Sequence, residues 1–286
     1  MNLISSILTD LDNTIYNWID FYAPCFRAMV HVIARHTATE EQHVTQQFKD
    51  VFAKFKSVEY PFSIQHLELC SGLNPERVKQ LVYLGQMAFG RARRKHLKIY
   101  PGVVHTLAWA MRNHIPVVGV TNAPLYLAWR RLVRLGLSRF FVGIVAGEDF
   151  PVPEDDIYAA DYKSTVIATQ TEVRWHVLAL RKKPDPAMYE DVLTALALNR
   201  EKTWIIGDSL AKDVAPAIAI GANGIWARYG TQFERENYET ILAITHWSED
   251  QISSTYSENS IVPTAVIDEF SELEGMIETE QLSLLR

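Results

Sequence analysis

The sequence predicts an α/β fold whose core is a parallel sheet with helices on both faces. Three short apolar runs are typical of strands buried on both faces: Leu3, Ile4, Ile7 and Leu8, then residues 117–120, then residues 204–206. Each run stops at a small group of polar residues, as strands do at the ligand-binding edge of a parallel sheet. Between the second and third runs, residues 188–198 carry apolar side chains at helical spacing.

The first strand ends in two carboxylates, Asp10 and Asp12. Side chains two apart in a strand point to the same face, so we expect both carboxylates on one side of the sheet. Two like charges at a buried strand end repel and lose hydration, and a divalent cation is the simplest compensation. An Asp also serves as a nucleophile toward phosphorus, while a second carboxylate moves a proton. The alternative is a strand that runs into an ordinary polar turn.

Residues 18–99 show a helical pattern of apolar residues directly after this first strand. Asn74-Pro75-Glu76 is a favourable helix start, with Asn as the cap and Pro in the first helical position. The pattern predicts a smaller all-helical domain inserted after the first strand. Its two cysteines, Cys25 and Cys70, lie amid apolar residues and are expected to be reduced core residues.

The second and third predicted strands also end in chemically useful side chains. Thr121-Asn122 follows the second run, and Asp208 follows the third, with Asp213 five residues later. Lys183 precedes the amphipathic stretch between them. Each of these features also has a non-functional alternative. Thr121-Asn122 could be an ordinary turn, and Asp213 could be a first-turn residue that faces the helix dipole. Lys183 could be a solvated cation at a helix start. The carboxyl ends of parallel strands meet at one edge, however, so three such ends predict one site.

These residues, in this order, resemble the four motifs of the haloacid dehalogenase superfamily of phosphohydrolases. The motif residues are Asp10, Asp12 and Thr14, then Thr121, then Lys183, then Asp208 with Asp213. The resemblance covers roughly residues 1–16 and 100–230 and continues more weakly to about residue 273. It implies a Rossmann-like parallel-sheet core, residues 1–16 and 100–286, and a helical cap domain, residues 17–99.

The resemblance also implies catalytic roles. Asp10 would be the nucleophile that becomes an aspartyl phosphate. Asp12 would protonate the leaving oxygen and then activate the hydrolytic water. Thr121, with Asn122 and neighbouring amides, would bind a phosphoryl oxygen, and Lys183 would place a positive charge against both the phosphate and Asp10.

The implied cofactor is Mg²⁺. The Asp10 carboxylate, the Asp12 backbone carbonyl and Asp208 would hold the ion. Asp213 would hold the water shell of the ion or orient Lys183. Mg²⁺ takes about six oxygen ligands and keeps several waters, so one or two carboxylates are sufficient.

The second carboxylate, Asp12, narrows the expected chemistry. Dehalogenase members of the superfamily resemble this site but lack that Asp, because cleaving a carbon–halogen bond requires no protonated oxygen. We therefore expect a phosphatase acting on a small phosphorylated metabolite; sugar phosphates, phosphoglycolate-like acids and nucleoside monophosphates are all open. The alternatives are a phosphotransferase or phosphomutase with the same site, and a non-catalytic phosphate- or partner-binding protein.

Composition agrees with a folded cytoplasmic enzyme. Of the 286 residues, 48% are hydrophobic and the net charge is −6, which gives no general reason to expect nucleic-acid or membrane binding. No segment approaches the length and apolarity of a membrane span. We expect a monomer or a homodimer.

Two stretches depart from shorter members of the superfamily: residues 148–180 and 231–262. In the first, the β-like runs 164–169 and 172–180 predict an edge hairpin or flap, with Arg174, Trp175 and His176 as alternative substrate contacts. The second is polar, has Trp247 as its obvious anchor, and precedes a last strand expected at residues 264–267.

Overall fold

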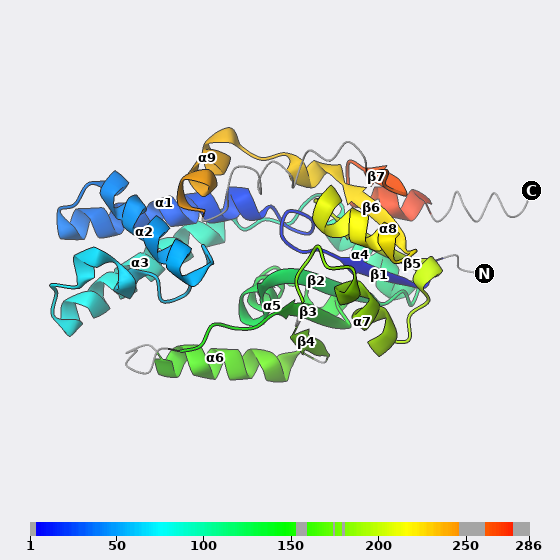
Figure 1. The fold of residues 1–286 in the computed structure, drawn as a ribbon, viewed down its shortest axis with the longest axis horizontal. Coiled ribbons are helices and arrows are strands. Elements are labelled where there is room, and N and C mark those ends of the chain that lie inside the picture. The colour runs from blue at the N-terminus through cyan, green and yellow to red at the C-terminus, as the bar shows by residue number, and fades with distance from the viewer. Residues whose placement is uncertain (1–3, 153–158, 174, 179–180, 246–260, 277–286) are drawn as a thin grey trace, which may run out of the picture. The chain divides into compact units, whose positions relative to one another are not determined.

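The computed structural model describes residues 4–152, 159–173, 175–178, 181–245 and 261–276 (Figure 1). These residues form two compact units. The sheet unit contains the described residues of 4–17, 99–232 and 261–276, and the helical unit contains residues 18–98 and 233–245. No helix among the described residues combines the length and apolar character needed to cross a bilayer.

The sheet unit is built on one seven-stranded parallel sheet in the described part of the chain. Its strands are β1 (Ser6–Thr9), β2 (Val117–Pro124), β3 (Gly143–Gly147), β4 (His176–Leu178), β5 (Thr203–Gly207), β6 (Asn223–Ala227) and β7 (Ala265–Ile267). The predicted parallel α/β core is therefore confirmed, and the three apolar runs are β1, β2 and β5.

The strand order is β4-β3-β2-β1-β5-β6-β7. β1 lies at the centre, with Leu8 beside Val118 of β2 and beside Ile205 of β5. The chain adds strands outward on one side as far as β4 and then returns to the other side of β1 with β5. This reversal is the point where open α/β sheets form a binding crevice at the carboxyl ends of their strands.

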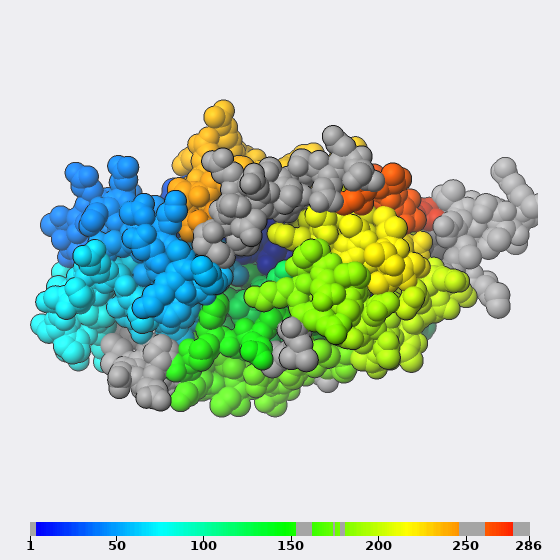
Figure 2. Space-filling model, viewed as in Figure 1, coloured from blue at the N-terminus to red at the C-terminus, as the bar shows by residue number. Residues whose placement is uncertain are grey.

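Helices cover both faces of this sheet. They are α4 (Val103–Arg112), α5 (Leu125–Arg134), α6 (Ala159–Glu172), α7 (Ala187–Ala195) and α8 (Ala215–Ala219). In Figure 1, α7 and α8 lie in front of the sheet and α4 behind it, and in Figure 2 the atoms of α7 and α8 cover much of the front. Leu8, Val120 and Ile205 on that face pack in one buried cluster with Tyr189 of α7 and Ala217 of α8. Burial on both faces explains the continuous apolar runs of β1 and β5.

The described residues also form short helical turns between the longer elements. They are η1 (Ile64–His66), η2 (Glu68–Cys70), η3 (Ser138–Phe140), η4 (Arg200–Lys202), η5 (Leu210–Val214) and η6 (Arg228–Thr231). Five of these have 3₁₀ geometry, whereas η5 is a π-helical turn. π-Helical turns occur often at functional sites, and η5 follows the end of β5.

The helical unit contains four described helices. They are α1 (Trp18–Thr37), α2 (Glu41–Phe55), α3 (Pro75–His96) and α9 (Arg235–Ile244). Phe26 of α1 meets Phe48 of α2 edge to face, with ring centroids 5.2 Å apart. As predicted, Asn74 caps α3, because its side chain accepts a hydrogen bond from the Arg77 amide. Cys25 and Cys70 are free thiols and both are buried, as expected.

The predicted hairpin in residues 148–180 is wrong. Residues 159–172 form helix α6 instead, and only residues 176–178 form a strand, β4, at the sheet edge. β4 runs parallel to β3, with His176 beside Ile144. Two parallel strands need a crossover connection, usually a helix, whereas a hairpin joins antiparallel strands. The topology thus overrides the β propensity of the Ser-Thr-Val-Ile run.

The second departing stretch, residues 231–262, contains a helix that the sequence did not indicate. Residues 235–244 form α9, which belongs to the helical unit. Asn237 ties it to α1: its side-chain oxygen accepts from Arg27 at 2.7 Å, and its amide nitrogen donates to Asp20 at 2.9 Å. Trp247 lies outside the described residues, and the expected last strand is β7.

Candidate active site

The carboxyl end of β1 places Asp10 at the centre of the site. The Asp10 amide donates to the Ile206 carbonyl at 2.8 Å, so the sheet pairing extends through this residue. The chain then turns sharply: the Leu11 carbonyl accepts from the Ile15 amide at 2.9 Å, and Asn13 adopts a left-handed φ of 58°. Asn tolerates this conformation better than most residues. The turn leaves the Asp10 carboxylate buried, with 7% of the residue exposed.

Lys183 brings its charge to Asp10 from a distant part of the chain. Its ammonium Nζ donates to Asp10 Oδ1, and to Asp213 Oδ1 at 2.7 Å. The hydroxyl of Tyr189 donates to the same Asp213 oxygen at 3.0 Å. All these side chains are buried, so they form a closed network in which ammonium and phenol donors meet carboxylate acceptors.

Asn122 holds the backbone of Lys183 against the end of β2. Its side-chain oxygen accepts from the Lys183 amide at 2.9 Å, and its side-chain nitrogen donates to the Lys183 carbonyl at 3.2 Å. Asn122 thus uses its side chain to position the lysine. Its neighbour Thr121 is buried and accepts from the Ala123 amide at 3.1 Å, which leaves the hydroxyl hydrogen to donate.

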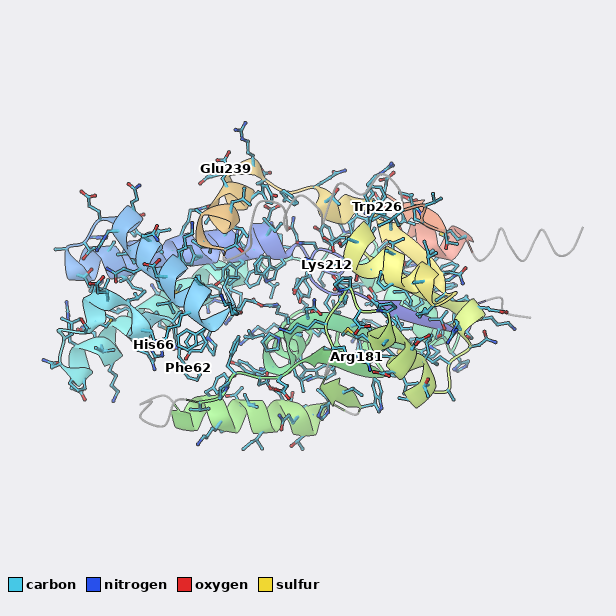
Figure 3. The ribbon with its side chains drawn as sticks, in the orientation of Figure 1. Phe62, His66, Arg181, Lys212, Trp226 and Glu239 are labelled. Atoms are coloured by element: carbon cyan, nitrogen blue, oxygen red, sulfur yellow. The ribbon has the colours of Figure 1, made fainter. Side chains whose placement is uncertain are left out.

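The end of β5 contributes two more carboxylates, Asp208 and Asp213. Asp213 lies in the π-helical turn η5, where its Oδ2 accepts from the Ser209 amide at 3.3 Å. A Cβ on Gly207 would lie 2.2 Å from Asp213, so only glycine allows this close approach. The indole of Trp226 donates to the Asp208 carbonyl at 2.9 Å and fixes the strand end (labelled in Figure 3).

The loop after β6 closes tightly on the first motif. The hydroxyl of Tyr229 donates to the Thr14 carbonyl at 2.6 Å. At Gly230, a Cβ would lie 2.0 Å from the Asn13 carbonyl oxygen and 2.7 Å from the Asp208 Cβ. These residues were not singled out from the sequence, because their importance depends on a contact between segments more than 200 residues apart.

The site carries more negative than positive charge. Burial, with the charges of Asp213 and Asp12, raises the pKa of Asp10 to about 7, although Lys183 acts in the opposite direction. Burial, then the charges of Asp10 and Asp213, raises the pKa of Asp208 well above its usual range. Burial alone would lower the pKa of Lys183, but the two carboxylates beside it outweigh burial and raise it. Three carboxylates share one ammonium group here.

This arrangement fits a divalent cation. Carboxylate oxygens from Asp10, Asp208 and Asp213 all lie within 4.8 Å of one another. Oxygen ligands suit hard cations such as Mg²⁺ and Ca²⁺. A bound cation would supply the positive charge that the three buried carboxylates lack. The acidic group therefore fits a metal centre on both donor chemistry and charge.

Asp12 has different surroundings from Asp10. Its side chain is 26% exposed, and its Oδ1 accepts from Nη1 of Arg131 at 3.1 Å. The Arg131 side chain is only 5% exposed. This partner was not predicted from the sequence, because Arg130-Arg131 in an amphipathic helix is typical of a solvent-facing pair of cations.

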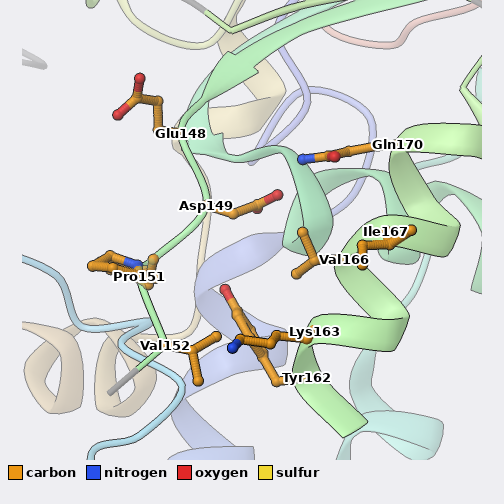
Figure 4. Close-up of a pocket in the computed structure, with 10 residues that line it drawn as sticks. Glu148, Asp149, Pro151, Val152, Tyr162, Lys163, Val166, Ile167 and Gln170 are labelled. Atoms are coloured by element: carbon orange, nitrogen blue, oxygen red, sulfur yellow. The ribbon is translucent and has the colours of Figure 1, made fainter. Parts of the chain in front are cut away.

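A cavity of about 360 Å³ lies between the loop that follows β3 and helix α6. Figure 4 shows Asp149 and Gln170 among the side chains that line it. Asp149 also accepts a hydrogen bond from the Tyr126 amide at 2.8 Å, at the start of α5. Of the alternative substrate contacts, Trp175 packs against the sheet core and His176 lies in β4, while Arg174 is outside the described residues.

Comparison with protein families agrees with the geometry. A model of haloacid dehalogenase-like hydrolases matches residues 4–221 of the 286 residues. The chain belongs to the haloacid dehalogenase-like hydrolase family. A second, HAD-hydrolase-like model matches residues 180–273. The first match begins before Asp10 and extends past Asp213, so it contains every residue of the network.

Individual relatives of this hydrolase are distant. A glyceraldehyde 3-phosphate phosphatase of Methanopyrus kandleri is 22% identical over 237 residues, 82% of this chain and 88% of the relative. Phosphoglycolate phosphatase 1 of Pseudomonas aeruginosa is 26% identical over 168 residues, 59% of this chain and 49% of the relative. A crystal structure of a 2-haloacid dehalogenase from Pseudomonas syringae pv. Tomato has a TM-score of 0.54 at 18% identity, covering 96% and 99% of the two chains. The fold is thus shared by family members with different chemistries.

Proposed function

We propose that this hydrolase is a Mg²⁺-dependent phosphatase that releases phosphate from a small phosphorylated metabolite through an aspartyl-phosphate intermediate. The observation that carries the proposal is the pair of acidic residues at the end of β1: a buried Asp10 bonded to Lys183, and a more exposed Asp12 two residues later. Relatives named as phosphatases support the same reaction class.

In the first step, a carboxylate oxygen of Asp10 attacks phosphorus, and the bond from phosphorus to the leaving oxygen breaks. The electron pair of that bond goes to the leaving oxygen, which takes a proton from Asp12. The products are an alcohol and an acyl phosphate on Asp10, that is, the aspartyl phosphate. Lys183 and the Thr121 hydroxyl would oppose the charge that develops on the phosphoryl oxygens, which is the main way proteins accelerate such transfers.

In the second step, Asp12 takes a proton from water as the water oxygen attacks phosphorus. The bond from phosphorus to the Asp10 oxygen breaks, and its electron pair restores the Asp10 carboxylate. Inorganic phosphate leaves, and Asp12 is again protonated for the next cycle. A single carboxylate thus acts first as an acid and then as a base.

The metal would be held by Asp10, Asp208 and the backbone carbonyl of Asp12. When bound, Mg²⁺ supplies Lewis-acid stabilisation of phosphoryl charge. The contacts of Asp213 with Lys183, Tyr189 and Ser209 favour the second of its two expected roles, which is to orient the lysine.

Asp12 is also what argues against a dehalogenase, since releasing a halide needs no proton donor. The substrate class remains a small phosphate ester. Phosphoglycolate and glyceraldehyde 3-phosphate are the first candidates, on the names of the two relatives. The cytoplasmic location and the monomeric or homodimeric state stay predictions.

The test is phosphate release from a panel of metabolite phosphates that includes these two compounds, with Mg²⁺ or with EDTA. We expect release that requires the metal and that falls by at least about 1,000-fold in Asp10→Asn, since the nucleophile is lost. Arg130→Gln, which also removes a charge but lies outside the network, serves as the control. Release that survives Asp10→Asn would contradict the mechanism, and phosphoryl transfer to a sugar in place of water would identify a transferase.

A further inference from the structure

We propose that Arg131 is a positioning residue that fixes the Asp12 carboxylate for its proton transfers. The inference rests on the proposed function, in which Asp12 acts as acid and base. Its basis is the contact already described: Arg131 Nη1 lies 3.1 Å from Asp12 Oδ1, and the arginine side chain is 5% exposed. The arginine donates to the carboxylate at Oδ1.

The position of Arg131 in α5 is one that packing alone would not assign to arginine. The buried side of this helix is otherwise formed by apolar residues, among them Leu125, Ala128 and Leu132. A buried guanidinium loses its hydration, and only a well-placed acceptor offsets that loss. The neighbouring Arg130 shows the ordinary alternative: its side chain is 28% exposed and lies 3.8 Å from Glu172 of α6.

The element that carries Arg131 also begins at the predicted phosphate-binding segment. α5 starts at Leu125, directly after the end of β2 that contains Thr121 and Asn122. The helix is therefore a rigid connection between that segment and the carboxylate that must reach the leaving oxygen. Small errors in such positioning reduce rates strongly.

A second group supports the same carboxylate. Tyr16 is fully buried, and its backbone forms a β-bridge with Asp12. Burial raises the pKa of the Tyr16 phenol, and the charge of Asp12 raises it further while that of Arg131 lowers it, which puts this phenol in the same electrostatic neighbourhood. Asp12 is thus held at its backbone by Tyr16 and at its side chain by Arg131, which limits the rotamers that the carboxylate can adopt.

The consequence can be measured with leaving groups of different acidity. A proton donor accelerates departure of a poor leaving group strongly and of a good leaving group weakly. A misplaced Asp12 should therefore slow hydrolysis of phenyl phosphate by about 100-fold but that of 4-nitrophenyl phosphate by only about twofold. Loss of folding or of phosphate binding would slow both esters equally.

The experiment compares kcat/KM over a series of substituted phenyl phosphates for wild type, Arg131→Met, Arg131→Lys and Arg130→Met. We expect a shallow dependence on leaving-group acidity in wild type and Arg130→Met, and a steep one in Arg131→Met. Arg131→Lys keeps the buried charge with a single donor group, so it should fold and show an intermediate dependence.

If, for each of the two Arg131 variants, kcat/KM falls by the same factor with every ester, Arg131 only supports the fold and the inference is overturned. Should Arg131→Met fail to fold, the dependence measured in Arg131→Lys decides in the same way. Absence of phosphate release by wild type and Arg130→Met alike, from the phenyl esters and from the metabolite panel, would instead overturn the proposed function, and the inference with it.

Discussion

The buried Asp10 carboxylate predicts a stability of the metal-free protein that falls as pH rises, and Asp10→Asn should remove the part of this fall that Asp10 causes. Burial raises the pKa of Asp10 from its ordinary 3.8 to about 7. A raised pKa means that the folded state holds the proton more tightly than the unfolded chain does. This contribution to stability is fully present below pH 3.8 and is lost as pH rises toward 7.

The size of this stability change follows from the two pKa values of Asp10, 3.8 and about 7. Each pH unit of difference corresponds to about 1.4 kcal/mol, so the whole difference of roughly three units amounts to about 4 kcal/mol. About two of those units lie between pH 5 and pH 7. From pH 5 to pH 8, the free energy of unfolding of wild type should therefore fall relative to that of Asp10→Asn by about 3 kcal/mol.

The assay is urea unfolding of both proteins in EDTA at pH 5, 6, 7 and 8, with equal slopes against urea as a requirement for comparison. The difference between the two curves isolates the pH dependence that Asp10 causes, which includes its effect on the neighbouring Asp208. A difference that stays constant from pH 5 to pH 8, or that grows in favour of wild type, would refute the reasoning. Repeating the series in Mg²⁺ should remove the loss, because a bound cation favours the ionised carboxylates.

Three further predictions concern the same network. In thermal unfolding, Mg²⁺ at about 100 times its dissociation constant should stabilise wild type by about 3 kcal/mol. Asp208→Asn should lose most of this stabilisation. Equal stabilisation of both proteins would exclude Asp208 as a ligand. Gly230→Ala should lower both the melting temperature and Mg²⁺ affinity, because the new Cβ would lie 2.0 Å from the Asn13 carbonyl oxygen; an unchanged melting temperature would show that the loop yields freely. Tyr189→Phe removes one donor to Asp213, so it should cost about 1.5–3 kcal/mol of stability, measured by urea unfolding, and a neutral result would mean that Lys183 alone satisfies that oxygen.

The central part of the site could be predicted because each of its residues belongs to a short sequence pattern, an apolar run followed by polar side chains. Asp10, Thr121 and Asp208 each follow a short apolar run typical of a buried strand, and the ends of parallel strands meet at one edge. The sheet order adds what the sequence did not state: β1 lies directly between β2 and β5, so these three ends are neighbours.

The remaining features depend on contacts that a local pattern does not contain. Arg131 is a cation in an amphipathic helix, and only the placement of α5 against the end of β1 makes it a buried partner of Asp12. Helix α6 contains β-branched residues that favour a strand, but the parallel pairing of β4 with β3 requires a crossover. α9 lies in a polar stretch, and its attachment to α1 through Asn237 has no signature in sequence spacing.

The position of α9 has a consequence for the order in which the protein can fold during synthesis. Helices α1 to α3 leave the ribosome early, yet their unit also includes residues 235–244, which are made after β6. The sheet is interrupted in the same way, because residues of β1 pair with residues of β2 and β5 that lie 110 and 197 positions later in the chain. The helical unit is therefore complete only after residues 235–244 are made, and the sheet unit only after the strands that follow residues 18–98 are made. Neither unit is one continuous segment of the chain. The two units are consequently expected to mature together, late in translation, and a chain that stops before residue 235 should leave Asp20 and Arg27 without the partner that Asn237 provides.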